Sequence, residues 1–196
     1  PEGATLVVGH NAADKDECAR MIHEGRWSEF IREVPVHKGD FVSIVPGTVH
    51  AIKAGVMLLE TQQNSDITYR VYDYDRLSGG KKRELHVEKS IDVINAPAAP
   101  AENSIHNFAV VEENKPVLME KSAYYRVWKL VAALDADVRF SVNKDFDAKY
   151  LLVSVVSGSG AVNGVPVKKG DHFIVTNGCD ELELSGAMEL IISAEV

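Results

Sequence analysis

The stretch PGTVHAIKAGVMLLETQQNSDITYRVYDYDR, residues 46–76, opens with a Pro-Gly turn and ends in a run of acidic and aromatic residues. It predicts two strands, over residues 49–61 and 67–73, joined by a polar connection. Side chains alternate between the two faces of a strand, so we expect Arg70 on the more polar face of the second one. A barrel closed from these strands can aim His50 and Arg70 into one lumen.

The same stretch resembles the segment of type I mannose-6-phosphate isomerases, in their short bacterial form, that holds a zinc-ligand histidine and the active-site arginine. The matching positions are His50, within Gly-Thr-Val-His-Ala-Ile at 47–52, and Arg70, which is reached through Asn-Ser-Asp at 64–66. The similarity continues through Tyr-Asp-Tyr-Asp-Arg at 72–76. The resemblance implies that His50 binds zinc and that Arg70 is catalytic.

The residues just before His50 strengthen this interpretation. Lys-Gly-Asp-Phe-Val-Ser-Ile-Val-Pro-Gly, at residues 38–47, resembles the second sequence motif of cupins. In that family a glycine-acid turn precedes a strand, a Pro-Gly turn follows, and a histidine then points into the barrel. A tight turn reverses the chain at this point, and a neutral imidazole on a rigid strand binds a divalent metal with little ordering cost.

Part of this pattern recurs later in the chain. Lys-Gly-Asp at 38–40 returns at 169–171, and the same spacing carries Gly47 onto Gly178. The repeat predicts two jelly-roll copies. In the second copy Glu181 stands at the position of His50, so we expect that copy to bind no metal and to serve a structural role.

The other patterns predict a mainly β protein, a cupin-like double jelly roll with a few short helices. Asn163-Gly164 is a hairpin signal, and the Ala- and Pro-rich stretch 95–103 is the expected linker. Residues 1–94 are then the C-terminal part of the catalytic barrel with helical insertions, and residues 104–196 a second, degenerate jelly roll. Helices are expected over 14–24, 27–31 and 84–94, and strands over 4–8, 34–36, 124–130, 138–142, 150–156 and 188–193.

The expected metal site is short of ligands. A catalytic zinc takes about three protein ligands and keeps an open position, whereas the resemblance supplies only His50. In the family the other ligands come from earlier strands that have no match here, so we expect an incomplete first barrel and a C-terminal fragment of such an isomerase. The remaining histidines show no ligand spacing and are expected to be solvated or locally hydrogen-bonded: His10, His23, His37, His86, His106 and His172.

The resemblance implies interconversion of mannose 6-phosphate and fructose 6-phosphate by proton movement between C1 and C2. Zinc would orient the sugar oxygens, and Arg70 would stabilise the developing anion. A noncatalytic sugar-phosphate-binding or interaction module of cupin fold is the alternative. Another metal-dependent cupin enzyme, such as an oxygenase, would need histidine pairs that the sequence lacks. Without the resemblance, Arg70 alone would be an ion-paired or surface residue.

Composition limits the partners. The 196 residues carry a net charge of −8, which argues against nucleic acid or an anionic membrane but leaves room for a sugar phosphate in a local basic pocket. Cys18 and Cys179 form no CxxC pair, which favours a reducing cytoplasm. No apolar run approaches the roughly 20 residues of a membrane-spanning helix. The sequence favours no particular oligomeric state.

Overall fold

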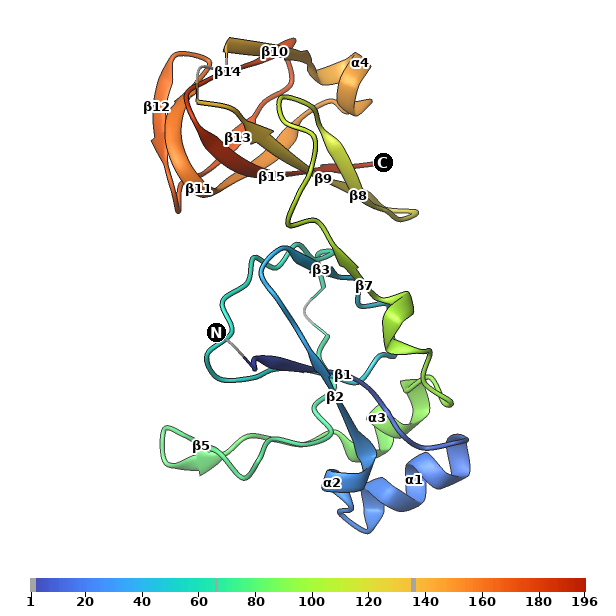
Figure 1. Cartoon of the computed structure of the whole chain (residues 1–196). Helices are drawn as coiled ribbons and strands as arrows, with labels where there is room; N and C mark the ends of the chain where they lie inside the picture. Colours follow the sequence, from blue (N-terminus) through green and yellow to red (C-terminus); the bar gives the residue numbers. More distant parts are fainter. Residues whose placement is uncertain (1–2, 66, 135–136) are drawn as a thin grey trace. The chain divides into compact units, whose positions relative to one another are not determined.

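The computed structural model describes residues 3–65, 67–134 and 137–196 (Figure 1). The chain divides into two compact units, one formed by residues 1–60 and 64–107 and the other by residues 61–63 and 108–196. The expected linker, 95–103, lies within the first unit, and it ends in the single 3-10 turn η1 (Ala101–Asn103).

The first unit is built on a three-stranded antiparallel sheet. Its central strand is β1 (Thr5–His10), which pairs with β2 (Ile31–Pro35) on one side and with β4 (His50–Ile52) on the other. The apolar run of β1 suits this position, because Val7 and Val8 are only 2% and 1% exposed. Two small antiparallel pairs complete the strands of the unit: β3 (Asp40–Val42) with β7 (Ile105–Asn107), and β5 (Leu77–Ser78) with β6 (Lys81–Lys82).

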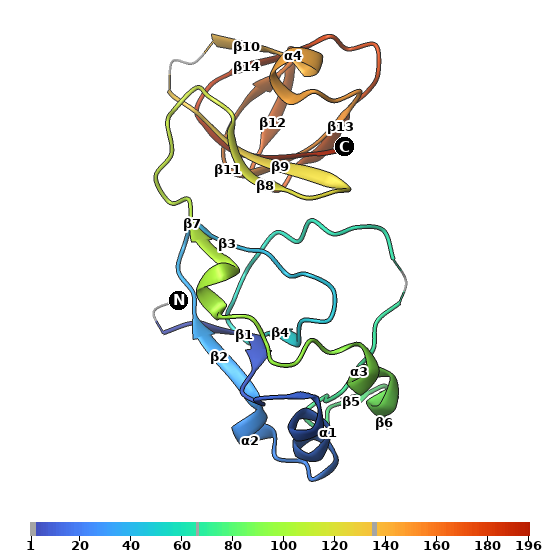
Figure 2. The same ribbon diagram turned by 90° about the vertical axis from the view of Figure 1, so that its right-hand side faces the viewer.

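Three short helices gather at one end of the first unit in Figures 1 and 2: α1 (Lys15–His23), α2 (Trp27–Phe30) and α3 (Val87–Val93). As predicted, α1 begins after Asp14, whose carboxylate accepts a hydrogen bond from the Glu17 N–H at 2.8 Å. The apolar faces of the helices share one core cluster, which includes Cys18, Met21, Ile22, Phe30, Ile91 and Ile94.

The predicted strands over 49–61 and 67–73 are wrong except at β4. Residues 53–65 and 67–76 form no strand, and Met57 and Ile67 are 89% and 67% exposed. A strand is stabilised by its pairing partner, and β4 has β1 as its only partner among the described strands. The face assignment that put Arg70 on the polar side of a strand therefore does not apply.

The second unit is nearly all β, as predicted, and its eight-stranded antiparallel sheet curls into a half-barrel (Figure 1). A short helix, α4 (Val142–Phe146), directly follows β10 (Asp137–Ser141). The strands in sheet order are β10 (Asp137–Ser141), β14 (Glu181–Ser185), β11 (Leu151–Val162), β15 (Met188–Glu195), β9 (Tyr125–Ala132) and β8 (Val117–Lys121); β12 (Val165–Lys168) and β13 (His172–Val175) also pair with β11. Of the helices in the described residues, none has the length and hydropathy to cross a membrane.

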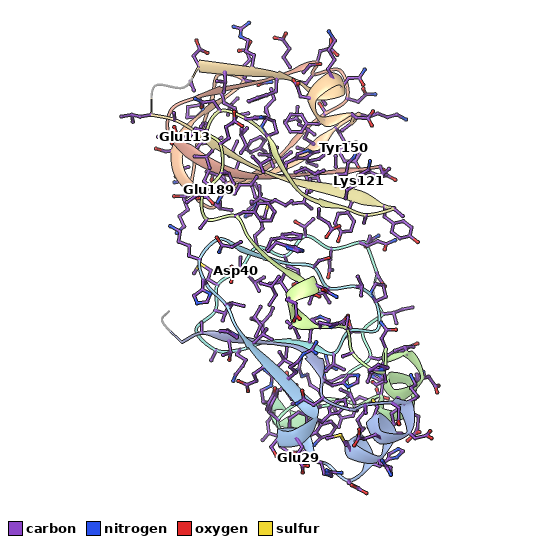
Figure 3. All side chains as sticks on the ribbon, turned by 45° about the vertical axis from the view of Figure 1, so that its right-hand side comes forward. Glu29, Asp40, Glu113, Lys121, Tyr150 and Glu189 are labelled. Carbon is purple, nitrogen blue, oxygen red and sulfur yellow. The ribbon has the colours of Figure 1, made fainter. Side chains whose placement is uncertain are left out.

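The turn between β11 and β12 confirms the predicted hairpin. Asn163 and Gly164 both have positive φ, 49° and 76°, and Val162 pairs with Val165 across them. Two consecutive residues of this kind are typical of a tight hairpin turn. Side chains fill the interior of the unit (Figure 3), where these residues are 0% exposed: Leu130, Leu151, Leu182, Leu190 and Ile192.

The sequence repeat is also a repeat of backbone structure. In the first copy the Asp40 carboxylate accepts a hydrogen bond from the His37 N–H at 2.6 Å, and the Asp40 N–H donates to the His37 carbonyl at 3.1 Å. Asp171 makes the same two bonds with Lys168, at 2.8 and 3.0 Å. The glycine before each aspartate has a φ of 91° in the first copy and 92° in the second. The two segments are thus built by the same local interactions.

Candidate functional site

The next turn of the repeat leads into His50, and it too has the same geometry in both copies. In the first copy the Thr48 N–H donates to the Val45 carbonyl at 3.2 Å, and in the second the Cys179 N–H donates to the Thr176 carbonyl at 3.0 Å. The glycine of each turn has positive φ, 83° in the first copy and 98° in the second. The chain therefore delivers residue 50 and residue 181 from matching turns.

The turn that immediately precedes His50, residues 46–49, is called here the His50-bearing turn. Two segments remote in sequence donate hydrogen bonds to its carbonyls. The side-chain amide of Asn95 donates to the Pro46 carbonyl at 2.8 Å, and its backbone N–H donates to the Gly47 carbonyl at 3.0 Å. On the β1 side, the Gly9 N–H donates to the Val49 carbonyl at 2.7 Å. Three carbonyls of one short turn are thus fixed by residues remote in sequence.

Asn95 is itself held by His10, a buried residue that is only 3% exposed. The His10 ring stacks on Phe30 with centroids 5.0 Å apart. Its Nδ1 accepts a hydrogen bond from the Ala12 N–H at 3.2 Å, so the proton lies on Nε2, which donates to the Asn95 carbonyl at 2.9 Å. Burial lowers the pKa of His10 below its usual value, and the neutral ring is favoured. The bond with Ala12 is local, as expected for this residue, whereas the bond with Asn95 joins positions 85 residues apart.

His50 begins β4 and its side chain is exposed. Its Nδ1 lies 2.9 Å from the Thr48 carbonyl oxygen. A carbonyl only accepts hydrogen bonds, so Nδ1 carries the proton and the lone pair of Nε2 remains available. Metal-binding histidines commonly donate their other ring N–H to a backbone carbonyl in this way. The imidazole therefore fits one ligand position of a divalent metal.

The described residues do not provide the further ligands that a metal site would need. Within residues 3–65, 67–134 and 137–196, no group of three or more His, Cys, Asp or Glu side chains is placed to hold a metal ion. A catalytic zinc needs about three protein ligands. Among the described residues, His50 alone would therefore not complete such a site.

Arg70 is fixed through its backbone to the residue ahead of α3. Its N–H donates to His86 Nδ1 at 3.2 Å, and its carbonyl accepts from the His86 N–H at 2.7 Å. The half-buried guanidinium makes one long hydrogen bond, 3.4 Å, to the Glu84 carbonyl. In the part of the chain that the structure describes, this guanidinium has no carboxylate partner, so most of its N–H groups are available to an anion.

The structure describes no hydrogen bond between His50 and Arg70 among the residues it covers. Their expected meeting in one lumen was inferred from two strands, of which only β4 forms, and it stays a prediction. Asp66, part of the Asn-Ser-Asp motif before Arg70, lies outside the described residues.

An ion cluster follows Arg70, at residues to which the sequence assigned no chemistry. Asp73 is 5% exposed and accepts hydrogen bonds from Arg83 Nε at 2.8 Å and Arg76 Nη2 at 2.7 Å. The hydrogen bonds from Arg83 hold the pKa of Asp73 well below its usual range, and the bond from Arg76 adds to the effect. Tyr72 stacks on Trp27 with centroids 4.5 Å apart. These contacts tie the segment after Arg70 to α2 and to the chain after β6.

A hollow of about 550 Å³ lies in the second unit beside the Asn177-Gly178 turn. Tyr150, labelled in Figure 3, lines it and donates a hydrogen bond to Glu195 at 3.3 Å. Its charged lining residues are Asp147, Lys149, Asp180 and Glu195. Because three of these four are carboxylates, the hollow is ill suited to a sugar phosphate, and neither His50 nor Arg70 lines it.

Similarity to known proteins identifies the family. The family described as mannose-6-phosphate isomerase, cupin domain, matches residues 134–195. The mannose-6-phosphate isomerase ManA of Bacillus subtilis (strain 168) is 43% identical over 195 residues, which is 97% of this chain, and the mannose-6-phosphate isomerase of Streptococcus mutans is 39% identical over 98% of it. The chain belongs to the mannose-6-phosphate isomerase family.

Solved structures agree with this assignment. The crystal structure of the mannose 6-phosphate isomerase from Bacillus subtilis matches with a TM-score of 0.78 and 33% identity, covering 98% of this chain and 61% of that one. A structure from Archaeoglobus fulgidus, with a TM-score of 0.67 and 11% identity, shares the fold. The resemblance seen in residues 46–76 and the mainly β, cupin-type fold are confirmed. This chain spans 60% of the length of each of the two named mannose-6-phosphate isomerases.

Proposed function

We propose that the protein acts as a mannose-6-phosphate isomerase, with His50 as a metal ligand, Arg70 as a catalytic residue and a sugar phosphate as substrate. The proposal is supported above all by the hydrogen bond of His50 to Thr48, at 2.9 Å. In the neutral imidazole this bond places the proton on Nδ1 and leaves the Nε2 lone pair available at the position that matches the family's ligand. The similarity to named isomerases over almost the whole chain supports the reaction class.

The reaction moves a proton between C1 and C2 of the sugar, and negative charge develops on the sugar oxygens. A divalent metal, which we take to be zinc, supplies a Lewis acid at these oxygens when bound. His50 contributes Nε2 to its ligand set. The Arg70 guanidinium offers forked N–H donors to the developing anion, and no carboxylate among the described residues occupies them.

The two halves of the chain differ in role. The first unit forms part of the catalytic barrel, and the second unit, which contains residues 108–196, forms the degenerate jelly roll. The second copy presents Glu181 in place of His50, and its carboxylate lies 3.9 Å from Arg139 Nη1. An ion-paired carboxylate at this position supports a structural role for the second copy. The cytoplasm is the compartment that fits a sugar-phosphate enzyme with two free cysteines.

A noncatalytic module that binds sugar phosphates is the second candidate. The incomplete ligand set of the described residues favours it, because Arg70 can bind a phosphate or sugar oxygen without a metal.

A coupled assay of mannose 6-phosphate turnover, with zinc added, tests the proposal. In an isomerase whose metal ligand set is complete, we expect zinc-dependent turnover that is abolished by His50→Ala and lowered by about 100-fold or more in Arg70→Lys, since a lysine cannot reproduce the forked donors. Glu181→Ala, at the matching position of the second copy, is the control and keeps full activity. Saturable binding of mannose 6-phosphate without turnover, unchanged by His50→Ala, would favour the module. Absence of both binding and turnover would exclude both candidates.

A further inference from the structure

The structure assigns a positioning role to Asn95, a residue that the sequence analysis left without a function. Asn95 fixes the turn at residues 46–49 so that Thr48 offers its carbonyl to His50 Nδ1 and the lone pair of Nε2 faces outward. His10 in turn holds Asn95. This inference rests on the proposed function, because it concerns how the proposed metal ligand is oriented.

Asn95 clamps two consecutive peptide groups of the turn. Its side chain and its backbone donate to the carbonyls of Pro46 and Gly47 at 2.8 and 3.0 Å. The bond within the turn itself, from the Thr48 N–H to the Val45 carbonyl, is longer at 3.2 Å. These two bonds, called the clamp below, therefore come from Asn95, which lies just after α3 and 49 positions from Pro46.

The clamp bears on His50 through the peptide groups on either side of Thr48. The Gly47 carbonyl before it is held by Asn95, and the Val49 carbonyl after it is held by the Gly9 N–H at 2.7 Å. With both neighbours fixed, the Thr48 carbonyl keeps its direction toward His50 Nδ1. Loss of the Asn95 side chain removes the bond to the Pro46 carbonyl and leaves only the backbone bond to Gly47 on this side of the turn. The turn can then shift and the Thr48 peptide group can rotate, so the imidazole is free to place its proton on Nε2, where it blocks a metal.

The support continues from Asn95 into the core. The Asn95 carbonyl accepts the Nε2–H of His10 at 2.9 Å, and the His10 ring is 3% exposed and stacked on Phe30. A buried, neutral ring with both nitrogens hydrogen-bonded has a fixed orientation. An exposed ligand is thereby connected to the hydrophobic core by a short series of hydrogen bonds.

The second copy of the turn offers an internal comparison. A Cβ added to Gly47 would lie 2.6 Å from the Val93 carbonyl oxygen and 2.7 Å from the Asn95 side-chain nitrogen, whereas a Cβ on Gly178 would meet no described atom within 4 Å. Among the described residues, the carbonyls of Pro46 and Gly47 accept hydrogen bonds from Asn95, whereas no bond of this kind reaches the matching carbonyls of Asn177 and Gly178 before Glu181. A contact needed only for folding of the turn would be expected in both copies.

The experiment compares Asn95→Ala with a matched control, Asn11→Ala, in the full chain. Asn11 also lies in the first unit and also donates its side-chain amide to a backbone carbonyl, that of Glu29, at 2.9 Å. Two-bond ¹H–¹⁵N spectra of the histidine side chains report the His50 tautomer, and zinc titration reports affinity, with His50→Ala as the baseline. We expect both variants to lower the unfolding midpoint similarly. Only Asn95→Ala should raise the Nε2–H tautomer of His50 and weaken His50-dependent zinc binding about 10-fold or more.

The inference is overturned if Asn95→Ala leaves the His50 tautomer unchanged, or if Asn11→Ala changes it equally. Zinc binding that is insensitive to His50→Ala would refute the metal role in the proposed function, whereas the tautomer measurement would still decide the positioning role. If Asn95→Ala does not fold, Asn95→Asp keeps the size of the side chain and replaces its donor with an acceptor facing the Pro46 carbonyl. The same tautomer change is then expected.

Discussion

Replacing Gly47 with alanine tests how tightly the His50-bearing turn is packed. Gly47 has a φ of 83°, and its added Cβ would lie 2.6 Å from the backbone oxygen of Val93. Gly178 occupies the same place in the second copy with a φ of 98°, yet its Cβ would meet no described atom within 4 Å. The two substitutions share the backbone strain and differ in the steric contact.

The expected magnitudes follow from these contacts. An alanine in the left-handed region costs roughly 1–2 kcal/mol, so Gly178→Ala should lower the free energy of unfolding of the second unit by about that amount. Gly47→Ala must in addition displace the turn or the end of α3, because Val93 contributes a backbone atom that no rotamer change can move. Overpacking of this kind adds about 1–3 kcal/mol, so we expect a total loss of roughly 2–5 kcal/mol in the first unit.

Urea titrations followed by resolved amide signals from each unit measure both values separately. A correct packing argument requires that Gly47→Ala be more destabilising than Gly178→Ala and that its effect appear in the first unit. Equal losses in the two variants would show that the contact with Val93 is relieved without cost and that the turn is loosely held.

Three further outcomes are expected. Leu190→Ala should destabilise the second unit by about 2–5 kcal/mol in urea titrations, whereas Leu152→Ala should cost much less, because Leu190 is 0% and Leu152 44% exposed. Since burial lowers the pKa of His10, the unfolded chain binds the extra proton below the ordinary value of 6.5, and the urea midpoint of the first unit should fall as the pH drops from about 7.5 to about 5.5, more than that of the second unit. The pKa of Asp73 is lowered by Arg83, so its stabilising effect is complete above the ordinary value of 3.8 and is lost progressively as the pH falls below it toward the lowered pKa of the folded chain. Acid titration of Asp73→Asn should therefore show a weaker loss of stability below pH 3.8.

The elements predicted correctly from the sequence depend on short-range chemistry. The Asp14 cap and the apolar stripe of α1 lie within one helix, and Asn163-Gly164 determines its hairpin through positive φ at adjacent residues. The Lys-Gly-Asp repeat likewise encodes hydrogen bonds between residues three positions apart. Such patterns fix the local backbone whatever surrounds it.

The prediction of strands over 49–61 and 67–73 was wrong because alternation of side chains says nothing about a pairing partner. β-branched and aromatic residues favour a strand only on a pleated, half-buried surface. Met57 and Ile67 find no such surface in this structure.

The residues of the candidate site show the same difference: some belong to a local sequence motif, and others are brought together only by folding. The resemblance singled out His50 and Arg70, because their neighbours in sequence form a motif. No sequence pattern indicated His10 or Asn95, since His10 and Asn95 are 85 positions apart, and Asn95 lies 49 positions from Pro46. Only the folded chain brings these groups together.

The strand-free and mostly exposed segments 53–65 and 67–69 also determine where the chain is open to cleavage. A protease needs a locally extended stretch that enters its active site without disrupting a core, and these residues offer one. A cut there would sever the covalent path between His50 and Arg70. Each would still be anchored, His50 by the pairing of β4 with β1 and Arg70 by its two backbone hydrogen bonds with His86, so a nicked chain would retain both groups in their folded surroundings.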